Sequence, residues 1–169
     1  SETLLNEFSD IARMPKPHFK KNDLIKVLDE NIDLLKKIDN SINFKIHNKT
    51  GKKVIINFDN EQFNRLFFNL IKNSIESIQE KAKKTSKSLK NIDIEINQRR
   101  DYITINLIDT GEGFKDKKTK DIIKPYYTTK EKGTGLGLSI VDKIINDHNG
   151  SVKFLNTNNG AKVQIILPK

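Results

Sequence analysis

The chain has 169 residues, no cysteine and a formal net charge of +9 at pH 7. This length predicts one compact domain with a short arm, and a sequence without cysteine excludes disulfides and thiolate metal sites. No stretch approaches the about 20 consecutive apolar residues of a membrane-spanning helix, and no signal peptide opens the sequence. We therefore expect a cytoplasmic protein.

The first part of the sequence is predicted to be an arm. It carries a short amphipathic stripe that ends at Pro15 and Pro17, and about a dozen residues of helix are marginal alone. We expect the stripe to pack on another segment or on a second copy. Asn22 is then expected to cap a helix with an apolar face. Residues 42–47 and 54–58 are predicted as strands around the turn Asn48 to Gly51.

A longer helix is predicted to begin at Asp59. Asp59 can cap it, and Gln62, three positions later, completes a capping box worth about 1 kcal/mol. Apolar residues follow at helical spacing and define one buried face: Phe63, Leu66, Phe67, Leu70, Ile71, Ile75 and Ile78.

Asn69 and Asn73 lie four residues apart in this helix, with Glu76 beside them, on one flank of the apolar face. One interpretation is that these asparagines only face solvent. The other is a metal site, because Mg²⁺ bound to nucleotide phosphates takes oxygen ligands and keeps several waters. The glycine-rich segments farther along the chain favour the metal site.

Residues 92–96 and 102–108 alternate strictly and are predicted to form a hairpin, after which comes Asp109. A carboxylate at the end of a buried strand can accept hydrogen bonds from a ligand. The next glycines, Gly111 and Gly113, let the backbone approach a ligand closely. The alternative is an aspartate that only caps a turn.

Residues 110–135 show little periodicity and are predicted as a long loop, which in a compact domain is usually functional. Gly133, Gly135 and Gly137 alternate at the start of the next helix, where free N–H groups and the helix dipole favour phosphate. Tight turns also demand glycine, so one such segment alone indicates little. Two of them at a set distance, with the polar helix, indicate a nucleotide site.

The last helix is predicted to end at Gly150 in the C′ position, with His148 as a C-terminal cap favoured by the dipole rather than a catalyst. Residues 152–155 and 163–167 are expected to form a closing hairpin. Helices between hairpins predict the α/β (α+β) class. We expect a two-layer sandwich of a mixed, mainly antiparallel sheet packed against three helices, with a lid over the nucleotide and one solvated sheet face.

Lysines crowd residues 81–90 and 115–132. A nucleic-acid surface would need interleaved aromatic residues, which the first run lacks. We interpret the first run as a solvated helix end and loop and expect no nucleic-acid partner. The second run falls in the predicted loop, where cations can face phosphates.

Four segments resemble, in order and spacing, the N, G1, F and G2 boxes of sensor histidine kinases: Phe63 to Ile78, Asp109 to Phe114, Ile123 to Lys130 and Gly133 to Leu138. These kinases share an ATP-binding superfamily with gyrase, heat-shock protein 90 and the mismatch-repair ATPases of the MutL type. The opening segment, Glu7 to Pro17, further resembles the exit from the dimerisation helices of NtrY-type nitrogen-regulation sensor kinases. The resemblance implies a dimerisation-helix stub and linker at 1–17 and a catalytic and ATP-binding domain at 18–169.

The resemblance also implies ATP and Mg²⁺ as cofactors. Asp109 would accept the exocyclic amine of adenine, Asn73 would bind Mg²⁺, and Asn69 would be the upstream polar position of the same box. Lys130 would face the phosphates and complete a catalytic set with Asn69 and Asn73. The remaining nucleotide contacts that it implies are Gly111, Gly113, Thr129, Gly133, Thr134, Gly135, Leu136 and Gly137.

The position of Asn69 carries a glutamate in the superfamily's ATPases, where it activates water as a general base. An amide cannot take that proton, so we do not expect hydrolysis as the designed reaction. Histidine kinases instead phosphorylate a histidine followed by an acidic residue, and none of the three histidines here is so followed: His18, His47 and His148. The acceptor is therefore expected on a dimerisation domain outside this sequence, in a homodimeric parent anchored in the inner membrane, with a response regulator downstream.

Two other functions stay open. A serine/threonine kinase of the anti-sigma-factor type shares the nucleotide site, but the segment Pro125 to Lys130 and the arm favour the histidine kinase. A non-enzymatic binding module would need damaged boxes, and these are intact.

Overall fold

The computed structural model describes residues 14–115 and 137–169. The first described helix follows a short strand, and most later elements are strands. In chain order the elements are β1 (Lys20–Asp23), α2 (Leu24–Leu35), β2 (Asn43–Asn48), β3 (Ile55–Phe58), α3 (Asn60–Lys84), β4 (Asn91–Gln98), β5 (Tyr102–Asp109), α5 (Gly137–Asp147), β6 (Ser151–Asn156) and β7 (Ala161–Pro168).

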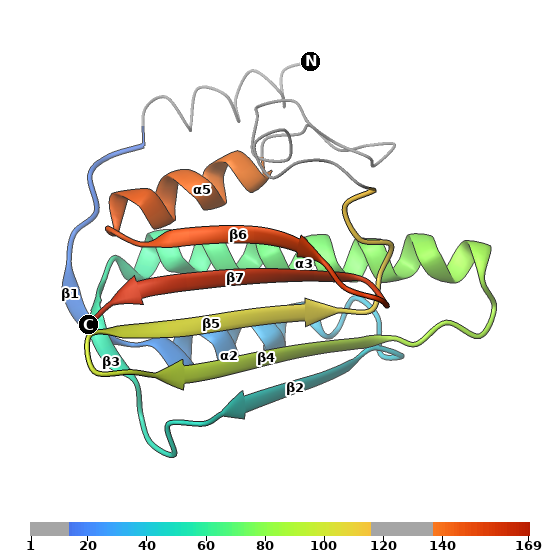
Figure 1. Cartoon of the computed structure of the whole chain (residues 1–169), viewed down its shortest axis with the longest axis horizontal. Coiled ribbons are helices and arrows are strands. Elements are labelled where there is room, and N and C mark those ends of the chain that lie inside the picture. Colours follow the sequence, from blue (N-terminus) through green and yellow to red (C-terminus); the bar gives the residue numbers. More distant parts are fainter. Residues whose placement is uncertain (1–13, 116–136) are drawn as a thin grey trace.

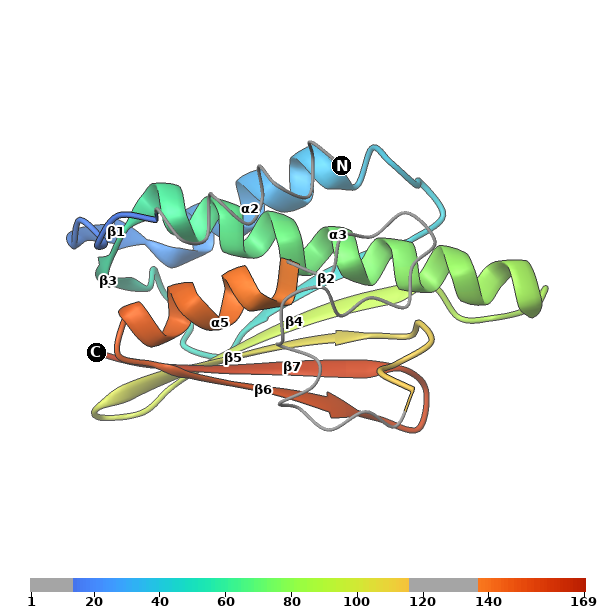
Figure 2. The ribbon, with the colours of Figure 1, turned by 90° about the horizontal axis from the view of Figure 1, so that it is seen from above.

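Five of the strands form one sheet in the order β2-β4-β5-β7-β6, while β1 and β3 pair separately (Figure 1). β2 runs parallel to β4, and every other pair of neighbours in the five-stranded sheet is antiparallel. α2, α3 and α5, the helices of the described residues, all lie on one face of this sheet (Figure 2). This confirms the predicted two-layer sandwich.

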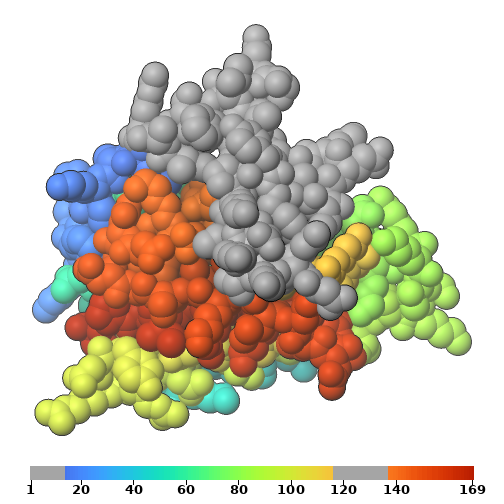
Figure 3. Space-filling model, turned by 45° about the horizontal axis from the view of Figure 1, so that its top comes forward, coloured from blue at the N-terminus to red at the C-terminus, as the bar shows by residue number. Residues whose placement is uncertain are grey.

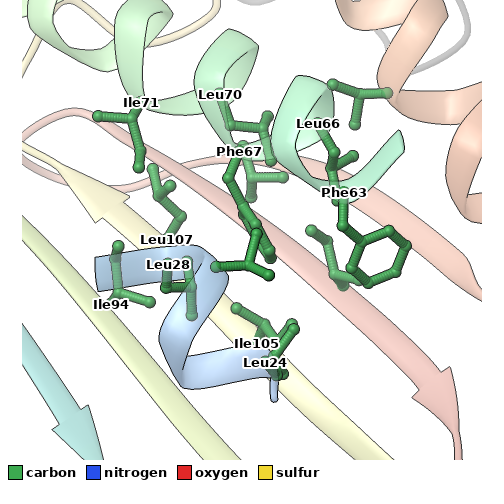
Figure 4. Close-up of a cluster of buried hydrophobic side chains, with 14 of the residues drawn as sticks. Leu24, Leu28, Phe63, Leu66, Phe67, Leu70, Ile71, Ile94, Ile105 and Leu107 are labelled. Atoms are coloured by element: carbon green, nitrogen blue, oxygen red, sulfur yellow. The ribbon is translucent and has the colours of Figure 1, made fainter. Parts of the chain in front are cut away.

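The core lies between the sheet and the helices. Alternate residues of β4 and β5 point toward the helices, and the apolar stripes of α2 and α3 meet them. Ten of these side chains, all at most 2% exposed, are labelled in Figure 4: Leu24, Leu28, Phe63, Leu66, Phe67, Leu70, Ile71, Ile94, Ile105 and Leu107. Each buried side chain of this size contributes roughly 1.5–3 kcal/mol of transfer free energy, so this layer holds α3 on the sheet.

Asp59 caps α3 as predicted, because its Oδ1 accepts the Gln62 backbone N–H at 3.0 Å. The reciprocal half of the predicted capping box is wrong. The Asp59 N–H donates to Nε2 of His148 at 3.1 Å, and the Gln62 side chain donates instead to the Pro15 carbonyl at 3.0 Å. The acceptor of the Asp59 N–H is therefore a distant residue, His148, instead of the Gln62 side chain of the capping box.

One further prediction near the N-terminus needs correction. Asp23, and not Asn22, caps α2, since its Oδ1 accepts the N–H groups of Ile25 and Lys26. The Asn22 amide is occupied elsewhere, donating to the Phe58 carbonyl at 2.8 Å. The strands on either side of the turn after β2 do not pair with each other: β2 joins β4, and β3 joins β1.

The end of α5 also differs from the prediction. Asn149, with φ 61°, occupies the left-handed C′ position that the sequence assigned to Gly150. Gly150 is the following residue, and its N–H bonds the Ile145 carbonyl at 3.0 Å. A Cβ there would lie 2.5 Å from the Ile166 carbonyl oxygen, so close packing on β7 explains this glycine.

Two hairpins are confirmed, β4 with β5 and β6 with β7. Within the described ranges, none of the helices has the length and apolar composition that crossing a bilayer would require.

Candidate nucleotide-binding site

Asp109 is the last residue of β5, the central strand of the five-stranded sheet. Strand alternation places it on the same face as Ile105 and Leu107, so its carboxylate points toward the helices rather than toward solvent. Only 5% of the residue is exposed. The strand therefore delivers a carboxylate into the layer between sheet and helices.

Both carboxylate oxygens of Asp109 accept hydrogen bonds. Oδ1 accepts the Gly111 backbone N–H at 2.9 Å, and Oδ2 accepts the Ser74 hydroxyl of α3 at 2.8 Å. Burial raises the pKa of Asp109, while these bonds oppose the rise because they stabilise the ionised form. The contact with Gly111 is the turn-capping bond of the alternative interpretation. The burial and the bond to Ser74 go beyond a cap.

One edge of α3 holds the segment after Asp109. Four side chains at helical spacing form this edge, which we call the α3 seam: Ser74, Ser77, Lys81 and Lys84. The Ser77 hydroxyl accepts the Glu112 N–H at 2.8 Å, and the Lys84 ammonium pairs with the Glu112 carboxylate at 2.8 Å. In Figure 3 the C-terminal part of α3 (green) lies beside residues 110–115 (yellow-orange).

Lys81 joins two loops. Its Nζ donates to the Gly111 carbonyl at 3.2 Å and to the Asn159 carbonyl in the β6–β7 turn at 2.9 Å. The interpretation of residues 81–90 as a solvated helix end is therefore wrong for Lys81. The sequence contains a signal for this role, because Lys81 lies seven residues after Ser74 and four after Ser77, on the same side of the helix.

The glycines after Asp109 are required by protein contacts. A Cβ at Gly111 would overlap the Ser77 hydroxyl. Gly113 has φ +76°, and a Cβ there would lie 2.7 Å from Oδ1 of Asn156, which accepts the Phe114 N–H. At both positions the close approach in this structure is to another part of the chain, whereas the sequence predicted an approach to a ligand.

Asn73 of α3 lies near the start of α5. Asn69 and Asn73 are half-buried. Asn73 approaches Gly137, the first described residue of α5, since a Cβ there would be 3.7 Å from Nδ2 of Asn73. In the described parts of the chain, no group of three His, Cys, Asp or Glu side chains could hold a metal. An amide oxygen that shares Mg²⁺ with phosphates and waters fits this surrounding.

The structure thus brings together part of the predicted site. Asp109 and Gly111 lie along the α3 seam, Gly113 lies against Asn156 and Gly160, and Asn73 lies beside Gly137. The other predicted contacts lie outside the described residues: Thr129, Lys130, Gly133, Thr134, Gly135 and Leu136. Sequence reasoning missed Ser74, Ser77 and Lys81, which contact the predicted adenine-binding segment directly.

Comparison with known proteins agrees with this geometry. Residues 58–169 match the family described as histidine kinase-, DNA gyrase B- and HSP90-like ATPase. A putative NtrY-like sensor histidine kinase of Rickettsia bellii is 30% identical over 162 residues, which are 96% of this chain and 25% of that protein. The chain thus spans about a quarter of the length of such curated relatives.

Solved histidine kinases share the fold. The nucleotide-free catalytic domain of ThkA superposes with a TM-score of 0.76 at 25% identity, over 90% of this chain and 98% of that domain. ThkA in complex with the response regulator TrrA superposes with a TM-score of 0.81 at 23% identity, over 99% of this chain and 47% of that one. With its family match over 58–169, the chain belongs to the histidine kinase-, DNA gyrase B- and HSP90-like ATPases.

Proposed function

We propose that this chain is the ATP-binding catalytic domain of a sensor histidine kinase, which transfers the γ-phosphate of ATP to a histidine on a dimerisation domain. One observation carries the proposal. A buried carboxylate, Asp109, points from the central strand to the same helix, α3, whose Asn73 lies beside the start of α5. These are the positions that adenine at one end and phosphates at the other would occupy.

Each end of the site has its own chemistry. Asp109 accepts the adenine amine, with Gly111 and Gly113 shaping the adjoining segment. Asn73 is the protein ligand of Mg²⁺, which would supply charge neutralisation at the phosphates. The N–H groups at the start of α5 favour phosphate. Lys130, Thr129 and the residues from Gly133 to Gly137 complete the phosphate contacts in this proposal.

Transfer to a protein acceptor fits better than hydrolysis. Asn69 stands one turn before Asn73 on α3, and its amide cannot take a proton from water. The role of this chain is then to position ATP and stabilise charge while a histidine attacks. ThkA is known in complex with a response regulator, and we propose a response regulator as the downstream partner here. A homodimeric, membrane-anchored parent and a linker stub at residues 1–17 belong to the same proposal.

The test is phosphotransfer in trans. The chain is mixed with a separately produced NtrY-type dimerisation domain, Mg²⁺ and ATP labelled in the γ-phosphate. We expect label on that domain as an acid-labile phosphate, and none on the chain alone. A dimerisation domain with its histidine replaced by glutamine is the control. An acid-stable phosphate would instead support the serine/threonine kinase, and rapid release of inorganic phosphate without transfer would contradict the proposal.

A further inference from the structure

Ser74 is a buried polar residue in the interior of a helix. Ser74 is 4% exposed and lies near the middle of α3. Alanine would favour the helix more and would bury no polar atom. A buried hydroxyl costs free energy unless it is hydrogen-bonded. The partner of this hydroxyl is Oδ2 of Asp109 at 2.8 Å, so its place in the fold is tied to that carboxylate.

Two of the hydrogen bonds to the Asp109 carboxylate come from different parts of the chain. The Gly111 N–H, at 2.9 Å from Oδ1, is supplied by the turn that follows Asp109. The Ser74 hydroxyl reaches Oδ2 from a different element. Together they restrain the plane of the carboxylate, and both stabilise its ionised form, in which it can only accept hydrogen bonds.

We infer that Ser74 is a specificity-determining positioning residue, which keeps Asp109 an acceptor and so selects purines with an amine at position 6 over purines with a carbonyl there. The inference rests on the proposed function, in which Asp109 faces that position. The 6-amine of adenine donates to the carboxylate. The 6-carbonyl of hypoxanthine presents a second acceptor, and two facing acceptors repel each other.

Removal of the hydroxyl changes what Asp109 can offer. Without Ser74, Oδ2 of Asp109 loses this donor, while Oδ1 keeps the Gly111 N–H. The ionised form is then stabilised less, and a protonated carboxyl group can donate to a 6-carbonyl. The preference for adenine over hypoxanthine then falls. A purely structural serine would affect both nucleotides alike.

Ser77 provides a matched control one turn farther along α3. Its hydroxyl accepts the Glu112 N–H at 2.8 Å, so it also holds the segment after Asp109. None of the hydrogen bonds described for Ser77 involves the Asp109 carboxylate. Ser77→Ala therefore removes a hydrogen bond that holds the segment after Asp109. It leaves the hydrogen bonds to the Asp109 carboxylate in place.

The experiment measures the Kd values of ADP and inosine diphosphate, with Mg²⁺, by calorimetry. We expect the preference for ADP to fall about tenfold in Ser74→Ala, which corresponds to one hydrogen bond to a charged group. Ser77→Ala should weaken both nucleotides equally. Ser74→Cys, which keeps the size of the side chain but is a weak donor, should lose part of the preference and serves if the alanine variant fails to fold.

The outcomes separate the two proposals. An unchanged preference in folded Ser74→Ala or Ser74→Cys overturns the role of Ser74. If the Ser74 variants keep the preference for ADP and Asp109→Asn abolishes it, the assignment of Asp109 to adenine binding is supported and only the role of Ser74 is wrong. A wild-type chain that binds neither nucleotide, or that shows no preference for ADP, overturns both the inference and the proposed nucleotide site.

Discussion

The imidazole of His148 accepts a hydrogen bond from the backbone N–H of Asp59 through Nε2 at 3.1 Å. Nδ1 lies 2.7 Å from the Ile144 carbonyl and must therefore carry the proton. His148 thus caps a carbonyl of α5 as predicted, but as a neutral ring. The residue is 3% exposed, and burial lowers its pKa. Hydrogen bonds to Asp59 and Ile144, rather than the helix dipole, therefore hold the ring.

The same junction holds the chain before β1. Oδ2 of Asp59 accepts the His18 backbone N–H at 2.8 Å, and the Phe19 ring packs edge-on against His148 with centroids 5.1 Å apart. In Figure 3 the surface around β1 (blue) adjoins α5 (orange). The entry to the domain, the start of α3 and the end of α5 therefore meet at one buried histidine.

His148 should make stability depend on pH. Because its pKa is lower in the folded protein, the unfolded chain binds a proton more readily, so stability falls as the pH drops below the ordinary value of 6.5. The loss is at most about 1.4 kcal/mol per pH unit. Urea unfolding at pH 7.5 and 5.5 should show a smaller difference for His148→Gln than for the wild type. His18→Gln, which leaves the backbone bond of His18 in place, should keep the full difference, and an unchanged difference in His148→Gln would contradict this prediction.

Lys81→Met should weaken both the fold and ADP binding, because it removes the bonds to the Gly111 and Asn159 carbonyls and keeps most of the aliphatic stem. We expect a loss of about 1 kcal/mol in the free energy of unfolding, measured with urea, and a lower ADP affinity by calorimetry. Lys83→Met is the control, since Lys83 is exposed and its ion pair among residues 14–115 and 137–169 runs along the helix, to Glu80. Equal effects of the two substitutions on stability and ADP affinity would show that the hydrogen bonds of Lys81 do not hold the segment after Asp109.

Asn73→Ala should abolish the contribution of Mg²⁺ to nucleotide affinity, because the variant lacks the amide oxygen that binds the metal. Calorimetry of ADP binding with Mg²⁺ and with EDTA measures that contribution. The helix should tolerate the change, as alanine is the better helix former. Asn60→Ala, at the exposed start of α3, should keep the response to Mg²⁺. If Asn73→Ala also keeps it, the metal ligand lies elsewhere.

Asn69→Glu should raise ATP hydrolysis by the isolated chain. A glutamate one turn before Asn73 restores a group that can take a proton from water, and a positioned general base contributes about 10²–10⁴-fold. We expect an increase of about tenfold or more, since the surrounding site is not adapted to it. Asn69→Gln has the same side-chain length and no basicity, so its phosphate release should stay at the wild-type level. Equal rates in both variants would show that residue 69 does not reach the attacking group.

Much of the fold could be predicted because it is encoded locally. The periodicity of α3 and the strict alternation in β4 and β5 are visible in short windows, as are the turns that join β4 to β5 and β6 to β7. The positions of Asp109 and Asn73 follow from their place at the end of a strand and on one flank of a helix. These features require only the backbone geometry of single elements.

The pairing of β2 with β4, of β1 with β3, and the contacts of His148 and Ser74 were decided by the tertiary structure. The Asp59–His148 bond joins residues 89 positions apart, and the Ser74–Asp109 bond joins residues 35 apart. Polar groups on a helix flank satisfy their hydrogen bonds with whichever buried partner the packing brings near, and no local pattern specifies that partner. The sequence by itself determined which residues could form a nucleotide site, whereas packing decided which side chains hold Asp109 in place.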